Sequence, residues 1–254
     1  MFPDQRRQKI LELLQENGSA RVRDLSNAFD VTEPTIRQDL EKLEMDGLIV
    51  REHGGAYIKD YTSPVETMTV THAEFLQQKR AIGEKAATFV NNNDTLIIDS
   101  GSTTTEFSRC LKNHRSLTIL TNALNIALIL GAEPTNEVMM TGGRFKAPTL
   151  SLTGETAAEL FPRIHADKLF LATRGFSIEN GLTYPGFSDL PVKKAMLESA
   201  NTVYLLADSS KIGVNAFASL GELDRVDVLI TDAGISSKQV HELEAYGMQV
   251  IIAD

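Results

Sequence analysis

The chain has 254 residues, of which 42% are hydrophobic and 23% charged, and its formal net charge is −9. These values are ordinary for a folded globular protein of one or two domains. The longest apolar runs, LNIALIL and VLIT, are too short to cross a membrane, and the N-terminus lacks the apolar stretch of a secretion signal. The single cysteine, Cys110, excludes an internal disulfide and a metal site built from several cysteines. We therefore expect a cytoplasmic protein without a membrane segment, a metal or a cofactor.

The first 60 residues are acidic as well, with nine Lys and Arg against twelve Asp and Glu. The broad basic surface of a non-specific nucleic-acid binder is therefore absent. If this region contacts DNA, a few well-placed cations must make the contacts.

Apolar spacing predicts three helices at the start of the chain. Residues 4–18 place Ile10, Leu13 and Leu14 on one face and end at a glycine, and residues 22–29 repeat this spacing over a shorter length. The third helix begins at Thr32, which is expected to supply the N-cap oxygen, with Pro34 in the first turn and Gly47 at the end. Two short β-runs, LIVRE and AYI, then flank a glycine-containing hairpin tip.

Three short helices followed by a β-hairpin predict a winged helix-turn-helix DNA-binding domain over residues 1–58. Such a domain lays its third helix in the major groove, with the N-terminal end of that helix toward the bases. The polar face of this helix points away from the apolar stripe of Ile36, Leu40 and Leu43. The side chains expected to contact DNA, from this helix and from the wing, are Thr32, Thr35, Arg37, Gln38, Lys42, Arg51 and His53. The alternative is a small helical interaction module whose charges are only a solvated face.

Residues 59–74 are polar, contain a proline and several threonines, and are predicted to be a linker. Over residues 75–254 predicted strands and helices alternate. The strands are continuous apolar runs, which are typical of a largely parallel sheet covered by helices on both faces, so we predict a Rossmann-like α/β domain. The expected helices are 74–90, 103–112, 123–131, 154–161, 190–200 and 237–247, and the expected strands are 95–99, 117–121, 137–143, 168–173, 202–208, 226–232 and 248–253.

Polar, small and basic residues gather where four of these strands end. Open α/β sheets bind ligands beyond the carboxyl ends of their strands. The loop from Asp99 to Thr104 combines backbone N–H groups, hydroxyl side chains and a helix N-terminus, which together suit a phosphate. Glycines let a ligand approach the backbone closely, and Lys211 brings a cation. We therefore predict a site for a small phosphorylated polyol built from Asp99, Ser100, Gly101, Ser102, Thr103, Thr104, Thr121, Asn122, Gly142, Gly143 and Lys211.

Each of these motifs also has a simpler interpretation. SGSTT is compatible with a plain helix N-cap, and Lys211 with a solvated surface lysine. Asp99 and Asp208 are compatible with caps of the adjoining helices. Four such strand ends in one sheet favour the ligand site.

Two stretches resemble the DeoR family of bacterial repressors. RRQKILELLQENG and VTEPTIRQDLEKLEMDGLIVREHGGA resemble its N-terminal domain, which has a TIRRDL recognition helix and an LxRxHGGA wing; Gln38 here replaces the commoner arginine. DSGSTT, DKLFLATRGFSIENGLT, VKKAM and LLADSSKIG resemble its effector domain, whose fold resembles ribose phosphate isomerases. The resemblance implies operator binding controlled by a sugar phosphate. Arg174 stands where the family has a small residue and would add a second cation to the pocket, and Leu190-Pro191 stand where the family commonly has Glu-Ala.

The alternative function is a sugar-phosphate isomerase or deaminase with an accessory N-terminal unit. Isomerisation through an enediol needs a positioned base, for which Glu155 and His165, just before Asp167, are the candidates. Neither lies in a catalytic motif, and the sequence has no metal-ligand spacing and no lysine-bearing P-loop. A purely structural scaffold explains neither the recognition helix nor the strand ends. We therefore expect a transcriptional repressor of a carbohydrate catabolic operon that is not an enzyme. Since one winged helix with few cations binds DNA weakly, we expect a homo-oligomer, a dimer or a tetramer, on paired half-sites.

Overall fold

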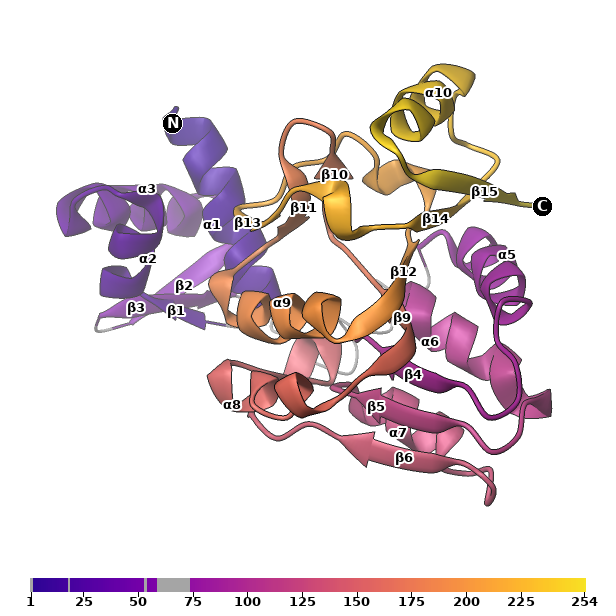
Figure 1. The fold of residues 1–254 in the computed structure, drawn as a ribbon. Helices are drawn as coiled ribbons and strands as arrows, with labels where there is room; N and C mark the ends of the chain where they lie inside the picture. Colours follow the sequence, from indigo (N-terminus) through magenta and orange to yellow (C-terminus); the bar gives the residue numbers. More distant parts are fainter. Residues whose placement is uncertain (1, 18, 53, 59–73) are drawn as a thin grey trace. The chain divides into compact units, whose positions relative to one another are not determined.

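The computed structural model describes residues 2–17, 19–52, 54–58 and 74–254 (Figure 1). The chain divides into two compact units, Met1–Thr69 and Val70–Asp254. The predicted linker at 59–74 lies, except for its last residue, outside the described residues, as does His53 of the predicted wing.

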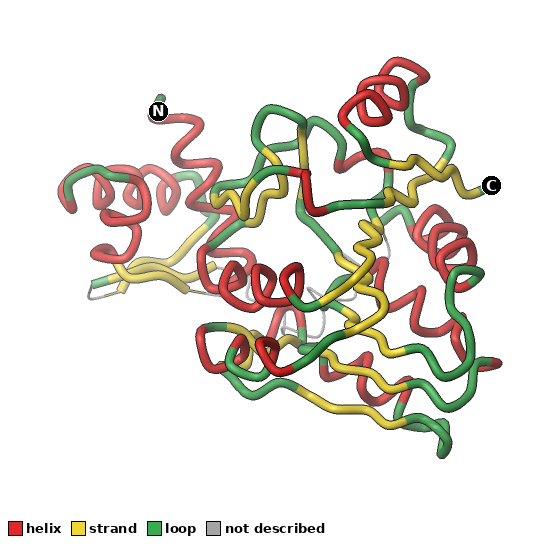
Figure 2. Tube along the Cα trace, in the orientation of Figure 1, coloured by secondary structure: helices red, strands yellow, loops and turns green. Residues whose placement is uncertain are grey.

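The first unit contains the three predicted helices and the hairpin. Its elements are α1 (Pro3–Asn17), β1 (Ser19–Arg21), α2 (Val22–Phe29), α3 (Glu33–Met45), β2 (Ile49–Glu52) and β3 (Gly55–Ile58). The strand β1 was not predicted, because three residues are too few to show an alternating pattern. It pairs antiparallel with β3, so the hairpin becomes a three-stranded sheet in the order β1-β3-β2 (Figure 2). The apolar stripes of the helices form the core of this unit, with Ile10, Leu25 and Ile36 fully buried.

The second unit is built on a seven-stranded sheet in the order β15-β14-β12-β9-β4-β5-β6 (Figure 1). Every neighbouring pair in this sheet is parallel, which confirms the predicted α/β class. The strands are β4 (Thr95–Ile98), β5 (Thr118–Thr121), β6 (Glu137–Met140), β9 (Ala166–Leu171), β12 (Ala200–Leu206), β14 (Val228–Asp232) and β15 (Gln249–Ala253).

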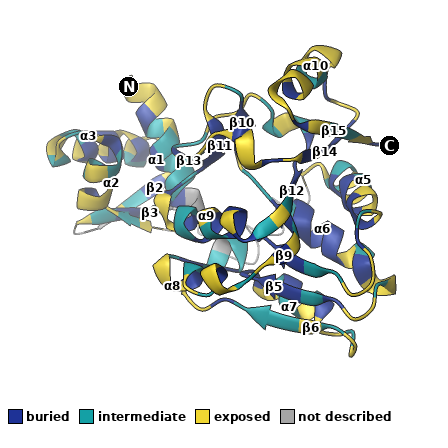
Figure 3. Cartoon of the chain, viewed as in Figure 1, coloured by how far each residue is buried: buried dark blue, intermediate teal, exposed yellow. Residues whose placement is uncertain are grey.

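Helices cover both faces of this sheet, which explains why its strands are apolar on both sides. On one face lie α5 (Leu76–Ala87), α6 (Ser102–Cys110) and α7 (Leu124–Leu130), whose apolar side chains form one core with Ile98 and Phe170. On the other face lie α8 (Glu155–Ala158), α9 (Leu190–Glu198) and α10 (Ser237–Tyr246), which form a second core with Ile97 and Leu169. The strand β14 is buried along its whole length and β4 and β9 along most of theirs, whereas the edge strand β6 is only partly buried (Figure 3).

Two small antiparallel sheets were not predicted. One is the hairpin of β7 (Arg144–Lys146) and β8 (Ser151–Thr153), and the other contains β10 (Gly175–Ser177), β11 (Gly181–Tyr184) and β13 (Ala218–Gly221) in the order β10-β11-β13. Their strands have three or four residues and lack the apolar runs of the main sheet. Short 3-10 helices complete the unit: η1 (Leu111–Asn113), η2 (Ala147–Thr149), η3 (Phe161–Arg163), η4 (Phe187–Asp189), η5 (Ser209–Lys211) and η6 (Leu223–Arg225).

Candidate functional site

The outer face of α3 presents the side chains that the sequence singles out. The inner face buries Ile36, Leu40 and Leu43. The outer face exposes Arg37, Gln38 and, one turn later, Lys42. The side chain of Arg37 is 59% exposed, and its Nη2 donates to Glu33 Oε2 at 2.6 Å. The predicted outward orientation of this face is therefore confirmed.

The N-terminal cap of α3 differs from the prediction. Thr32 is the N-cap residue, but its hydroxyl makes no cap hydrogen bond and lies 3.0 Å from the hydroxyl of Thr35. Pro34 lies in the first turn, as expected, and lacks one of the backbone N–H groups that a cap oxygen normally accepts from. The prediction that the Thr32 hydroxyl caps this helix is thus wrong, and the hydroxyls of Thr32 and Thr35 instead pair with each other at the start of the helix.

A buried ion pair fixes α3 to α1, and the sequence analysis missed it. Arg6 Nε donates to Asp39 Oδ2 at 2.5 Å, and Arg7 Nη1 lies 3.5 Å from Asp39 Oδ1. Both Asp39 and Arg6 are buried. Asp39 falls within the apolar stripe of the helix, three residues after Ile36, and this position was the signal that its carboxylate would face inward.

The wing is tied to α3 through a surface ion pair. Arg51 on β2 donates to Glu44 twice, from its backbone N to Oε1 at 3.0 Å and from its Nε to Oε2 at 2.7 Å. The hydrogen bond from the Arg51 backbone, and then that from its side chain, lower the pKa of Glu44. Arg51 is therefore held against α3 by Glu44, with its guanidinium still partly exposed.

In the second unit, the loop after β4 runs straight into α6 at the carboxyl edge of the sheet. Gly101 is the N-cap residue of α6, and a Cβ at this position would lie 2.5 Å from the Cβ of Ala172. Only glycine fits this close approach between the loops that follow β4 and β9. The first turn of α6, at Ser102 and Thr103, has backbone N–H groups without partners inside the helix, as every helix N-terminus does.

Not all hydroxyls of this loop are available to a ligand. The Thr104 hydroxyl donates to the Gly101 carbonyl at 3.0 Å, and the Thr105 hydroxyl donates to the same oxygen at 2.7 Å. These bonds brace the start of α6. Among the loop hydroxyls predicted to hold a phosphate, that of Thr104 is thus engaged locally.

Thr121 and Asn122, at the end of β5, hold this loop in place. The Thr121 hydroxyl donates to the Ile98 carbonyl at 2.6 Å and accepts from the Ala123 backbone at 3.1 Å. Asn122 Oδ1 accepts from the Ser100 backbone at 3.0 Å, and its Nδ2 donates to the Leu152 carbonyl at 3.2 Å. Both side chains are fully buried, so their polar groups bind the protein's own backbone.

Asp99 forms a buried ion pair that the sequence did not predict. Its side chain is 0% exposed, and Lys193 Nζ donates to Oδ1 at 2.8 Å and to Oδ2 at 2.6 Å. Oδ2 also accepts from the Ala172 backbone at 3.1 Å. Burial raises the pKa of Asp99, and the charge of Lys193 opposes this rise. Asp99 therefore does not cap α6, and both of its oxygens have partners within the protein.

A second buried pair lies beside the first. Lys146 Nζ donates to Asp189 Oδ2 at 2.8 Å, and Asp189 stands four residues before Lys193. Lys193 also lies over the ring of Tyr184, with its Nζ 4.7 Å from the ring centroid. Together these side chains make a charged layer beneath the carboxyl edge, on the face covered by α9. The VKKAM stretch that contains Lys193 was noted only for its resemblance.

On the opposite face of the same edge, Asp208, Lys211 and Lys79 lie together. Asp208 Oδ1 accepts from the Ser210 backbone at 3.1 Å, so Asp208 caps η5, while its buried Oδ2 has no hydrogen-bond partner among the described residues. Lys79 on α5 is only 3% exposed. Its pKa is lowered first by burial; the charge of Asp208 opposes this and that of Lys211 adds to it. Lys79 is a candidate site residue that the sequence analysis missed, because nothing local marks a helical lysine as buried.

The helix α5 brings Lys79 against α6. A Cβ on Gly83 would lie 2.7 Å from the Phe107 backbone N, so the two helices cross with their backbones nearly touching. Lys79 lies one turn before Gly83 on α5. Glu106 on α6 also acts on the pKa of Lys79 through its charge, which agrees with this placement.

The remaining predicted positions have different surroundings. Gly143 has φ of 119°, and a Cβ there would lie 2.8 Å from both the Cβ of Ala157 and the carbonyl oxygen of Thr153. Glycine is thus needed at 143 for packing against α8. Gly142 is exposed beside it. Arg174 follows β9 at the carboxyl edge and is exposed, with no ion pair to any described residue.

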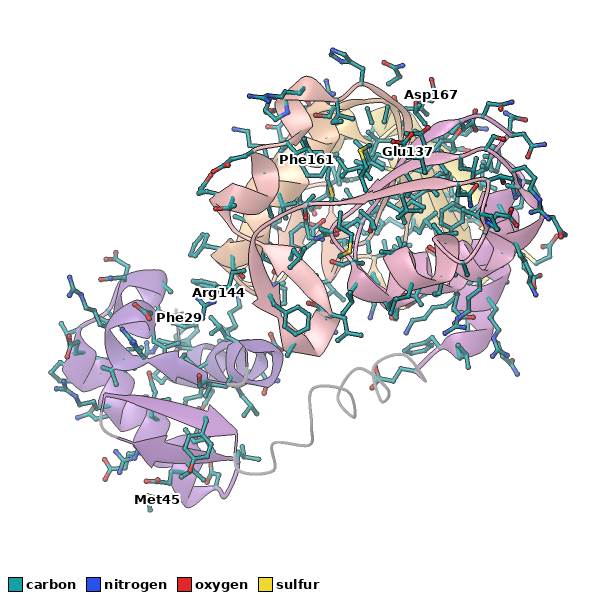
Figure 4. All side chains as sticks on the ribbon, turned by 90° about the horizontal axis from the view of Figure 1, so that it is seen from below. Phe29, Met45, Glu137, Arg144, Phe161 and Asp167 are labelled. Atoms are coloured by element: carbon teal, nitrogen blue, oxygen red, sulfur yellow. The ribbon has the colours of Figure 1, made fainter. Side chains whose placement is uncertain are left out.

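One of the two candidate bases of an isomerase, His165, lies away from this edge. His165 and Asp167 lie where β9 begins, at the amino edge of the sheet, where Figure 4 labels Asp167 and Glu137. Asp167 accepts from Thr95 twice, from the backbone at 2.8 Å and from the hydroxyl at 2.6 Å, and these hydrogen bonds lower its pKa. A hollow of about 170 Å³, lined largely by apolar side chains, lies at the amino edge too and is separate from the predicted phosphate loop. Glu155 is exposed at the start of α8.

Within the described parts of the chain, no helix has the length and apolar character needed to span a membrane. The same residues contain no cluster of three His, Cys, Asp or Glu side chains with metal-binding geometry.

A three-helix unit with a β-hairpin wing, in one chain with a parallel α/β unit, is the architecture of a helix-turn-helix transcriptional regulator with a sensor domain. Residues 6–62 match the DeoR-like helix-turn-helix domain, and residues 74–233 match the DeoR C terminal sensor domain. The chain therefore belongs to the DeoR family of transcriptional regulators.

Relatives match over nearly the whole chain. The HTH-type transcriptional regulator GolR of Listeria innocua is 34% identical over 254 residues, which cover 100% of each chain. The glycerol-3-phosphate regulon repressor of Escherichia coli is 31% identical over 235 residues, 92% of each chain. Among solved structures, ribose 5 phosphate isomerase A from Neisseria gonorrhoeae aligns with a TM-score of 0.40 at 18% identity, over 54% of this chain and 53% of that one.

Proposed function

We propose that this chain is a repressor of a carbohydrate catabolic operon and that a phosphorylated sugar or sugar derivative controls its binding to operator DNA. Two relatives support the class of operon by name: the glycerol-3-phosphate regulon repressor, and a putative aga operon transcriptional repressor of Escherichia coli O157:H7 that is 32% identical over 250 residues. The observation that carries the proposal is the grouping of two lysines, Lys79 and Lys211, beside the helix that the SGSTT loop opens.

This grouping suits a phosphate for an electrostatic reason. The first turn of α6 offers backbone N–H groups and a partial positive charge, which compensate only part of a dianion. Lys79 is desolvated, so its ammonium gains from a nearby anion. Lys211 lies in η5, which follows a different strand, β12, and adds a second cation. Ser100, Gly101, Ser102 and Thr103 would face the phosphate, while Asp99, Thr104, Thr121 and Asn122 would hold the loop, with Gly142, Gly143 and Arg174 at the outer part of the site.

Operator reading is assigned to the exposed start of α3 and to the wing. Thr35, Arg37 and Gln38 would face base edges or phosphates in the major groove, and Lys42 and Arg51 the DNA backbone. Thr32 would contribute from the N-terminal end of the helix, and His53 from the tip of the wing.

We propose that the chain binds its effector without turning it over. His165 lies at the amino edge of the sheet, and the carboxylate of Asp99 in the phosphate loop is paired with Lys193, so neither is placed as the free base that an isomerase needs. Prolonged incubation of the purified protein with each bound sugar phosphate, followed by NMR, should show no product. Product formation at a catalytic rate would favour the isomerase alternative.

A homo-oligomer on paired half-sites, a dimer or a tetramer, follows from the small number of cations on α3 and the wing. Analytical ultracentrifugation of the full chain, alone and with DNA, tests this assembly. A chain that binds DNA tightly as a monomer would contradict it. We place this regulator in the cytoplasm, with the DNA that it binds.

The ligand experiment uses the full chain and a labelled duplex selected by that chain from a random-sequence library. Phosphorylated polyols of three to six carbons, each paired with its unphosphorylated form, are tested by isothermal titration and by their effect on DNA binding. Lys211→Ala should weaken binding of the phosphorylated form by about 1.5–3 kcal/mol, the range for hydrogen bonds to charged groups. DNA affinity without ligand should stay unchanged.

Lys238→Ala is the matched control, because Lys238 on α10 is a highly exposed lysine that pairs with Glu242. This variant should bind every ligand as the native chain does. If native protein and Lys211→Ala bind phosphorylated and free sugars alike, the phosphate site has been assigned to the wrong place.

A further inference from the structure

A carboxylate stands at the end of α3 that would approach DNA. Glu33 is the first residue of the helix, and its Oε2 accepts from Arg37 Nη2 at 2.6 Å, one helical turn away. Both side chains are substantially exposed, at 42% for Glu33 and 59% for Arg37. An anion at this position faces a polyanion when the helix enters the groove, so its presence calls for a physical explanation.

A gain in helix stability explains only a small part of why a carboxylate stands at position 33. A carboxylate in the first turn interacts favourably with the helix dipole, and an exposed pair four residues apart adds a similarly small term. Both effects are screened by salt. Neither requires that the partner of Glu33 be the arginine expected to contact bases.

The geometry leaves Arg37 able to bind a base while it is held. A guanidinium has five N–H donors in one plane, and a guanine edge takes two of them through O6 and N7. The bond to Glu33 occupies one N–H of Nη2 and leaves those of Nη1 and Nε available. A held guanidinium keeps its plane and loses less rotamer freedom on binding.

We propose that Glu33 is a positioning residue for operator specificity: it holds Arg37 for a base edge and opposes its use on phosphates. The proposal rests on the proposed function, in which α3 reads the operator through Arg37. Once released from Glu33, Arg37 swings freely toward the nearest phosphate, a contact that is independent of sequence. The carboxylate itself also repels the DNA backbone, which weakens binding to every sequence that does not offer the base contact.

The test compares specific and non-specific binding. Full-length protein is titrated by fluorescence anisotropy against a duplex selected by the native chain and against a scrambled duplex of the same length and composition. Glu33→Gln keeps the shape of the side chain and removes its charge. Its ratio of specific to non-specific affinity should fall about tenfold, mainly through tighter binding of the scrambled duplex.

The same helix offers a matched control. Lys42 Nζ and Asp46 Oδ1 lie 3.4 Å apart near its C-terminal end, with the same spacing of four residues and similar exposure. Asp46→Asn removes the same charge from the same helix without touching Arg37. This variant should keep the native ratio, so an equal fall in both variants would assign the effect to net charge and overturn the proposal.

A double-mutant cycle with Arg37→Ala separates the remaining outcomes. Arg37→Ala should weaken binding to the selected duplex at least about tenfold, and Glu33→Gln should have no further effect on the ratio in that background. If Glu33→Gln still lowers the ratio there, Glu33 contacts a base directly, and the positioning role is wrong. If Arg37→Ala leaves the native ratio intact, the proposed operator contact itself fails. If Arg37→Ala acts but Glu33→Gln does not, only the positioning role fails.

Discussion

Replacing Lys193 by methionine removes one partner of the most deeply buried ion pair at the carboxyl edge. Asp99 is 0% exposed and Lys193 4% exposed, so in the variant water cannot replace the lost lysine as a partner of the Asp99 carboxylate. Asp99 would keep one hydrogen bond, from the Ala172 backbone at 3.1 Å, and lose the two from Lys193 at 2.8 and 2.6 Å. Removing one partner of a buried pair costs about 3–5 kcal/mol. We expect Lys193→Met to lower the free energy of unfolding of the second unit by that amount at pH 7.5.

The pH dependence of this loss identifies its cause. Burial already raises the pKa of Asp99, and Lys193 opposes the rise, so the pKa climbs further in the variant. A carboxyl group whose pKa is higher in the folded state destabilises the fold as the pH rises through that folded pKa. The gap between variant and native chain should therefore shrink from pH 7.5 to pH 5, as Asp99 takes up a proton.

Urea unfolding followed by circular dichroism measures the gap at each pH, and hydrogen exchange of peptides from residues 75–254 assigns it to the second unit. Adding Asp99→Asn to Lys193→Met should recover part of the lost stability, because it removes the unpaired charge. A loss below about 1 kcal/mol, or one that does not change with pH, would show that Asp99 and Lys193 do not form a desolvated pair in solution.

Two further substitutions test the architecture. Asp39→Asn leaves Arg6 buried without its counter-charge and should destabilise the first unit by about 3–5 kcal/mol. Thermal melting of the full chain measures this loss, and an unchanged melting temperature of the first unit would mean that Arg6 reaches solvent. Gly83→Ala places a Cβ 2.7 Å from the Phe107 backbone N, which should force α5 and α6 apart and lower the free energy of unfolding by about 1–3 kcal/mol. A gain in stability in the same melting experiment, as alanine gives in an open helix, would contradict the close crossing.

The elements that local pattern specifies were predictable from the sequence. Residues 22–29 and the third helix follow directly from the spacing of apolar residues, since a helix buries every third or fourth side chain wherever it packs. The seven parallel strands are continuous apolar runs because both of their faces are covered. Strands such as β1 and β10 have three residues each and depend on partners far along the chain, so no local signal identifies them.

The candidate site was predictable as backbone and much less so as side-chain contacts. The end of the apolar strand run predicts the position of the loop from Asp99 to Thr104. What Asp99 does there depends on Lys193, which lies 94 residues later in the sequence and reaches it only through the packing of α9 on the sheet. The burial of Lys79 likewise depends on how closely α5 crosses α6. Thr104 and Thr32 show a different failure, because a hydroxyl chooses among several nearby partners that the sequence ranks equally.

The strand order of the main sheet has a consequence for the growing chain during synthesis. Outward from β4, the strands β5 and β6 follow one another in sequence order on one side, and β9, β12, β14 and β15 follow one another on the other side. Each new strand therefore finds a neighbour that has already left the ribosome, and the sheet can grow at both edges without rearrangement. The first unit is translated earlier and closes on local contacts, which form quickly, whereas β9 must return across about 70 residues to reach β4. At a synthesis rate of about 5–20 residues per second, a nascent chain would thus have a folded DNA-binding domain for roughly 10 s or more before the sensor domain is complete.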